Sequence, residues 1–174
     1  MQEASLFSEA ETMLNNQLDK EDLQILELLQ QDAHMTHKEI GKRLHKSVTP
    51  IHVRVKRLKE EGYIKRYVAI VDPAKVGQGL IAYTQVQLKE HSQQALSTFQ
   101  KEVVKLPEVL ECYHMSGIFD FLLRITIRDM NAYNEVLMTK LSKLPDVGNM
   151  QTFFVLSAAK QETAYPLADK PGKI

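Results

Sequence analysis

A helical pattern of apolar and polar residues runs from Ser47 to Gly62. Its apolar positions recur at steps of three and four, so they share one face of a predicted helix: Val48, Ile51, Val55 and Leu58. The opposite face carries Thr49, His52 and Lys56, and the flanks carry Arg54, Arg57 and Lys59. We expect Ser47 to cap the helix and Gly62 to end it, with Pro50 tolerated in the first turn. Such a helix fits the DNA major groove, although an ordinary surface helix has the same pattern.

Two further helices are predicted before it. Asp19 can cap a helix over residues 20–31, whose inward positions are Leu23 and Leu26 with Ile25 or Leu29. The sequence Thr36-His37-Lys38-Glu39 matches a capping box, so a second helix should run from there to about Leu44, with Gly41 permitting close helix contact. Residues 45–46 then form a short turn. Three helices with a tight turn between the second and third predict a helix-turn-helix domain, which makes the third a recognition helix.

The second half of the chain alternates between strand and helix patterns. Residues 63–71 are β-prone, and residues 76–79 have the composition of a hinge. We then expect strands at 80–88, 109–115, 119–127 and 150–158, and helices at about 92–106 and 131–144. The segments Lys105–Val109 and Lys143–Val147 repeat one pattern at equivalent places. The order βαββαβ predicts a ferredoxin-like sheet with one exposed face, and therefore at least a dimer.

The predicted fold class is α+β, with a winged-type helix-turn-helix domain followed by a ferredoxin-like effector and oligomerisation domain. We expect an N-terminal arm (1–17), the helix-turn-helix domain (18–63), a β-linker (64–79), the βαββαβ domain (80–160) and a C-terminal tail (161–174).

Charge is distributed unevenly along a chain whose formal net charge is zero. Residues 42–66 hold nine bases and two acids, a net charge of +7, which leaves 13 bases against 20 acids elsewhere. A localised basic segment of this kind indicates binding to phosphate. The single cysteine, and the lack of a signal-peptide or membrane-span pattern, predict a cytoplasmic protein with no membrane partner.

Four motifs carry a resemblance to a known family: Leu18-Asp19-x-x-Asp22-x-x-Ile25-Leu26-x-x-Leu29, Ser47-x-Thr49-Pro50, Arg54-Val55-Lys56-Arg57-Leu58-x-x-x-Gly62-x-Ile64 and Gly117-x-Phe119-Asp120. In this order, with the two predicted domains, residues 18–167 resemble the leucine-responsive/asparagine regulator (Lrp/AsnC) family of transcription factors. The resemblance implies no cofactor. It also implies dimerisation through the second domain and assembly of dimers into tetramers or octamers.

The resemblance further implies a small effector, usually an amino acid, bound between dimers. The implied contacts are Met115, Ser116, Gly117, Ile118, Phe119, Asp120, Met150 and Thr152. Ile118 and Met150 stand where many members of the family have polar residues, which leaves open a hydrophobic amino acid, a different ligand or no ligand. The Asp120 carboxylate would receive an amino group or, alternatively, stabilise the turn.

The recognition helix and its surroundings supply the candidate contacts to double-stranded DNA: Lys42, Lys46, Ser47, Thr49, Pro50, His52, Arg54, Lys56 and Arg57. Thr49, Pro50 and His52 would approach base edges, and the cations would contact phosphates. Arg54 has an equally good alternative role as a structural hydrogen-bond donor within the three-helix domain. A two-fold dimer would require a pseudo-palindromic site.

Other readings are weaker. Cys112 and His114 share a strand face, but no third orienting group accompanies them for nucleophilic catalysis. The histidines at 34, 37, 45 and 52 lack cysteines at zinc-ligand spacing, so we expect no metal site. Two other functions remain open alternatives: a tetrapyrrole-binding enzyme resembling the sirohaem decarboxylases, and a nucleoid-packing protein without sequence specificity. The basic helix argues against the enzyme.

Overall fold

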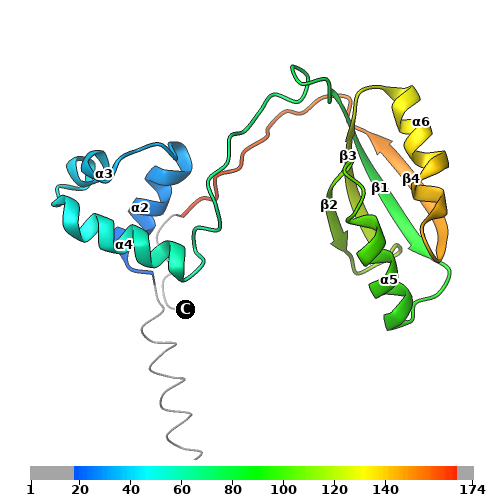
Figure 1. Ribbon diagram of the computed structural model, residues 1–174, viewed down its shortest axis with the longest axis horizontal. Coiled ribbons are helices and arrows are strands. Elements are labelled where there is room, and N and C mark those ends of the chain that lie inside the picture. Colours follow the sequence, from blue (N-terminus) through cyan, green and yellow to red (C-terminus); the bar gives the residue numbers. More distant parts are fainter. Residues whose placement is uncertain (1–17, 168–174) are drawn as a thin grey trace, which may run out of the picture. The chain divides into compact units, whose positions relative to one another are not determined.

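The computed structural model describes residues 18–167, which form two compact units (Figure 1). One unit contains the described residues up to Ala69 together with the segment from Lys160 onward, and the other spans residues 70–159. The predicted N-terminal arm lies outside the described residues. No helix in the described part of the chain is long and apolar enough to cross a membrane.

The first unit is built from three helices: α2 (Lys20–Gln31), α3 (His37–Leu44) and α4 (Val48–Glu60). The predicted caps of α2 and α3 are present, because Asp19 and Thr36 form reciprocal capping boxes with Asp22 and Glu39. One apolar cluster joins the three helices: Ile25, Leu29, Met35, Ile40, Ile51, Val55 and Leu58. The predicted three-helix arrangement is therefore confirmed.

The turn between α3 and α4 is tight because of two backbone features. His45 adopts the left-handed conformation, with φ of 54°. The Lys46 amide donates to the Gly41 carbonyl over 2.8 Å, and a Cβ on Gly41 would lie 2.7 Å from the Lys46 carbonyl oxygen. Glycine at position 41 is thus required for the close approach that sets the start of α4.

Three local expectations were wrong. Val48 is 47% exposed, because it lies in the first turn of α4 and outside the shared core. Ser47 occupies the N-cap position, but its side chain makes no capping hydrogen bond. Residues 63–79 contain no strand, since no neighbouring segment in the described chain pairs with them. Their apolar side chains are consequently exposed, including Val68, Ile70 and Val71.

The second unit is a four-stranded antiparallel sheet in the order β2-β3-β1-β4. Its elements follow the predicted order: β1 (Leu80–Leu88), α5 (Gln93–Val103), β2 (Val109–His114), β3 (Phe121–Ile127), α6 (Met130–Thr139), the 3₁₀ turn η1 (Leu141–Lys143) and β4 (Val147–Phe154). Both helices cover the same face of the sheet (Figure 1). This arrangement confirms the ferredoxin-like prediction.

Alternation along the strands separates a buried face from an uncovered one. The helix-covered face buries alternate residues of β1 and β3 against Phe99 and Val103 of α5 and Tyr133 of α6. The other face places Phe153 opposite Tyr83 and Tyr113 opposite Leu122, and Phe153 is 48% exposed. Within one chain, half of the sheet therefore remains uncovered.

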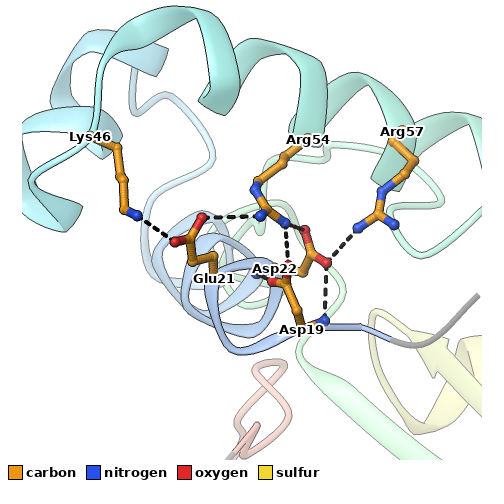
Figure 2. A network of polar contacts seen from close by, with 6 residues as sticks. All are labelled: Asp19, Glu21, Asp22, Lys46, Arg54 and Arg57. Atoms are coloured by element: carbon orange, nitrogen blue, oxygen red, sulfur yellow. Dashed lines mark hydrogen bonds and ion pairs between the residues drawn. The ribbon is translucent and has the colours of Figure 1, made fainter. Parts of the chain in front are cut away.

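An ion-pair network holds α2 against α4 (Figure 2). At its centre the Asp22 side chain is fully buried and accepts hydrogen bonds from Arg54 (2.8 Å) and Arg57. Arg54 also bonds to Asp19 over 2.6 Å and pairs with Glu21 over 3.1 Å.

Burial of Asp22 makes this network energetically consequential. A carboxylate without contact to water is tolerated only when cations and hydrogen bonds compensate it. The same contacts affect Asp19: burial raises the pKa of its carboxyl, but hydrogen bonds from the Asp22 amide and Arg54 outweigh burial, and the pKa lies below its ordinary value of 3.8. Arg54 and Arg57 are therefore structural partners of α2.

Replacing Asp22 with alanine should lower the free energy of unfolding of the helix-turn-helix unit by about 3 kcal/mol, because two arginines lose their buried partner. The matched control is Glu60→Ala, which removes an exposed ion pair with Lys56 (3.7 Å). This substitution should change the free energy of unfolding by less than about 0.5 kcal/mol. Hydrogen exchange of the amides in α2–α4 measures both values. Equal effects of the two substitutions would contradict this role of Asp22.

Candidate functional site

The front of α4 is a solvent-exposed surface. Of the nine residues predicted to contact DNA, seven are exposed: Lys42, Lys46, Ser47, Thr49, Pro50, His52 and Lys56. The other two, Arg54 and Arg57, are half-buried and turned toward α2 (Figure 2). The structure therefore divides the predicted set into an exposed group and a structural pair.

The exposed cations differ in how far they are engaged. Lys46 pairs with Glu21 over 2.5 Å, and Lys59 lies 4.8 Å above the Tyr67 ring. Lys56 forms a long, exposed pair with Glu60 over 3.7 Å. Exposed pairs of this kind contribute little to stability, so exchanging a carboxylate for a DNA phosphate would cost little. Lys56 is therefore accessible to phosphate, as is the exposed Lys42.

Two histidines meet at the front of the domain. His37 of α3 and His52 of α4 place their Nδ1 atoms 3.3 Å apart, with the rings edge to face. At this distance one ring must donate and the other accept, which requires that both be neutral or that only one be charged. Burial lowers the pKa of His37 below its ordinary value of 6.5, and repulsion from His52 and Lys59 lowers it further.

The second predicted site surrounds the loop between β2 and β3. Gly117 has φ of 130°, a conformation that favours glycine, and Ile118 is 86% exposed at the loop tip. Asp120 is buried: its carboxylate accepts the Leu88 amide over 2.8 Å, and its own amide donates to the Val86 carbonyl over 2.9 Å. The other carboxylate oxygen lies 3.2 Å from Nε2 of His91. Asp120 therefore fastens the loop to the end of β1.

The predicted contacts from β4 lie beside the same end of β1. Met150 pairs across the sheet with Val86 and is half-buried against the core. Thr152 pairs with Thr84, and their hydroxyl oxygens are 2.9 Å apart. The Tyr133 hydroxyl also bonds to Thr152, so the Thr152 hydroxyl already has two partners within the domain. Within one chain, the loop and Met150 flank the same end of β1 from opposite sides, and the Thr152 hydroxyl serves the core.

The other predicted loop residues are mostly exposed. Met115 and Ser116 lie on the surface, and Phe119 is half-buried. The Met115 amide donates to the Asp120 carbonyl over 2.8 Å and closes the loop. Two open cavities, of about 370 and 410 Å³, lie elsewhere in the two units and include none of these residues. The loop presents an open surface in a single chain.

The alternative chemistries find little support in the geometry. Burial raises the pKa of the Cys112 thiol, which makes it a poorer nucleophile, and His114 stacks on Phe121. Among residues 18–167, no three side chains of His, Cys, Asp or Glu come together in a way that could hold a metal ion.

Sequence reasoning missed two residues of this region. Asp22 shares a face with the buried Ile25 and Leu29 at steps of three and four, and that spacing could have revealed a buried carboxylate. Val53 is 59% exposed on the front of α4. Its position two residues from both Ile51 and Val55 was the available signal, because two residues turn a helix by about 200°.

Replacing His52 with glutamine should raise the pKa of His37 toward its ordinary value, because it removes a neighbouring charge. In the wild type, the pKa of His37 in the folded state is below its unfolded value of about 6.5. The contribution of His37 to stability is therefore complete above about pH 6.5 and is lost as the pH falls through the folded-state pKa. The histidine ring signals followed by NMR across pH report the titration. The control is the exposed His34→Gln, and an unchanged His37 pKa in the His52 variant would contradict the coupling.

Both domains of the chain match known protein families. Residues 18–65 match a family model described as winged helix-turn-helix DNA-binding, and residues 81–165 match the Lrp/AsnC ligand binding domain. A proline dehydrogenase transcriptional activator from Rhizobium radiobacter is 41% identical over 83% of this chain and 92% of its own. The leucine-responsive regulatory protein of Escherichia coli K12 is 35% identical over 83% of this chain and 88% of its own.

Transcriptional regulators of known structure also share this fold. A transcriptional regulator from Neisseria meningitidis, solved as a complex with L-methionine, is 34% identical and superposes with a TM-score of 0.83 over 87% of this chain and 98% of its own. These relatives are transcriptional regulators, and neither the decarboxylase nor the packing alternative finds support among them. With this identity across both domains, the chain belongs to the Lrp/AsnC family of transcriptional regulators.

Proposed function

We propose that this protein is a sequence-specific DNA-binding transcriptional regulator whose assembly or DNA affinity responds to a small effector, an amino acid. The observation that carries the proposal is the exposed front of α4, where Thr49, Pro50 and His52 stand beside exposed cationic side chains. The apolar back of the same helix is fixed to α2 and α3, so the front is presented on a rigid support.

The contacts to DNA fall into two groups. Thr49, Pro50 and His52 approach base edges in the major groove, and Ser47 stands at the start of the helix. Lys42, Lys46 and Lys56 contact phosphates and set the register of the helix on the duplex. Arg54 and Arg57 belong to the structural network, since their guanidinium groups are engaged by Asp22. Of the two roles that the sequence left open for Arg54, the structural one has the better support.

Assembly follows from the uncovered sheet face. Phe153 and Tyr83 lie on that face and Arg124 pairs there with Glu111 over 2.9 Å, so an aromatic surface surrounds a charged pair. A second copy packing its own sheet on this face would exclude water from it and produce a two-fold dimer. Further association of such dimers would give a tetramer or octamer. Each dimer would then present two copies of α4 to one DNA site.

The effector site of the proposed assembly is the β2–β3 loop together with Met150. The amides of Gly117 and Ile118 lie at the exposed loop tip, where they can receive a carboxylate, and the side chains of Ile118 and Met150 are apolar. The Neisseria meningitidis regulator was solved with L-methionine, which has that combination of groups. We infer a hydrophobic amino acid as the effector. A ligand bound between dimers favours one assembly state and so changes how many DNA-binding heads reach a promoter.

Selection of genomic fragments on the purified protein should enrich a pseudo-palindromic site, because a two-fold dimer presents α4 to two half-sites about one helical turn apart or a multiple of that spacing. A mobility shift with the enriched fragment, against a scrambled fragment of equal length, measures specificity at fixed salt. Equal retention of both fragments would contradict a sequence-specific regulator.

Calorimetric titration should show saturable binding of L-methionine or L-leucine and none of L-aspartate, because the side chains of Ile118 and Met150 are apolar. Ile118→Ser should weaken that binding. The control is Leu156→Ser, a similar change at a 98% exposed leucine of the same unit outside the loop. Lack of binding by every hydrophobic amino acid would rule out this class of effector.

A further inference from the structure

Val53 occupies the middle of the exposed front of α4. Its neighbours two positions away, Ile51 and Val55, are 0% and 2% exposed, so Val53 points away from the core. Thr49 lies one turn before it and also stands two positions from Ile51. The valine side chain and the threonine methyl group are therefore adjacent on the surface that faces outward.

Solvent exposure of Val53 is not explained by the fold of the domain. A β-branched residue loses rotamer freedom in a helix and is a poorer choice at an exposed position than alanine, lysine or glutamate. Val53 is 59% exposed and is outside the apolar cluster that joins α2, α3 and α4. Isolated exposed apolar residues are common, but this one lies among the residues proposed to approach base edges.

Chemistry restricts what Val53 can recognise in a major groove. Its side chain has neither donor nor acceptor and cannot read the hydrogen-bonding groups of the base edges. The apolar group that a base presents there is the 5-methyl group of thymine. The surrounding charge fits a DNA duplex, since Lys56 follows three residues later on the adjoining face and its exposed 3.7 Å pair with Glu60 can be exchanged for a phosphate.

We propose that Val53, assisted by the methyl group of Thr49, reads the 5-methyl group of thymine in each half-site. The inference rests on the proposed function, because it assigns a base to part of the same DNA surface. Thr49 and Val53 are separated by about 6 Å along the helix axis, so they reach the same base pair or near neighbours. The half-site should therefore contain at least one T·A pair whose methyl group contributes to affinity.

The test uses the enriched site with deoxyuridine substituted for thymidine, one position at a time. This change removes the methyl group and keeps every Watson–Crick and major-groove hydrogen-bonding group. At one or two positions in each half-site, the wild-type protein should bind the uracil site about threefold to fivefold more weakly, the factor expected from burying one methyl group. Equal binding at all positions would overturn the proposal.

Val53→Ala identifies the residue responsible. This variant should bind the thymine site more weakly by a similar factor and should no longer distinguish thymine from uracil at that position. Alanine favours a helix, so the variant should fold, and its far-UV circular dichroism verifies this. The control Lys56→Gln should weaken binding to both sites equally and keep the ratio between them. An unchanged thymine-to-uracil ratio in Val53→Ala would overturn the role of Val53.

A second arm isolates the methyl group from the base. Replacing the T·A pair with C·G should weaken binding, and 5-methylcytosine at that position should recover about threefold to fivefold in the wild type but not in Val53→Ala. The absence of recovery would contradict methyl recognition. If an operator is bound specifically while these ratios do not change, the inference fails and the proposed function stands. If no specific site exists at all, the proposed function fails first.

Discussion

The buried carboxylate of Asp22 is the constraint on which the DNA-binding half of the structure depends. A charge removed from water must be compensated within the protein, and here Arg54 and Arg57 of α4 provide the compensation. Together with the apolar cluster of the three helices, these contacts set the rotation of α4 about its own axis relative to α2. This rotation determines that Thr49, Val53 and His52 face outward while Ile51 and Val55 face the core. The outward orientation of Thr49, Val53 and His52 thus depends on the ion pairs between α2 and α4.

The same constraint changes how the basic segment should be understood. The net charge of +7 between residues 42 and 66 indicated phosphate binding, yet a large part of it neutralises the acidic first turn of α2. Local charge therefore overstates the number of cations available to DNA. Lys42 of α3 and Lys56 of α4 remain exposed, and these are the cations that we propose attract the duplex. An arginine within a basic segment is a phosphate contact only if no buried acid engages it.

The sequence predicted those features that depend on local pattern. The cap at Asp19, the capping box at Thr36, the helices they begin, and the βαββαβ order of the second unit were all expected, because caps and periodicity act over a few residues. The missed features join distant positions. The carboxylate of Asp22 contacts Arg54, which lies 32 residues later in the chain. The Gln30 side chain donates to the Tyr165 carbonyl over 3.1 Å and accepts from the Tyr165 amide over 2.7 Å.

Residues 63–71 failed as a strand for a related reason. Their β-branched side chains favour extended backbone, but a strand needs a partner, and none of the described residues provides one. The β2–β3 loop shows a further limit of prediction from sequence. The glycine and aspartate of its motif were recognisable, yet only the structure shows that the Asp120 carboxylate is used by the Leu88 amide. A sequence motif thus indicates candidate functional residues, but it does not predict their hydrogen-bond partners in the fold.

We propose that Lys56 contacts phosphate, whereas Arg54 holds α4 against α2. The salt dependence of operator binding tests this assignment most directly. Each phosphate contact contributes about 0.9 to the slope of log affinity against log salt. Lys56→Gln should reduce that slope by about 0.9, the value of one phosphate contact. Arg54→Gln, assayed under conditions in which the variant remains folded, should leave the slope unchanged. A slope reduced by the Arg54 substitution and unaffected by the Lys56 substitution would contradict the account.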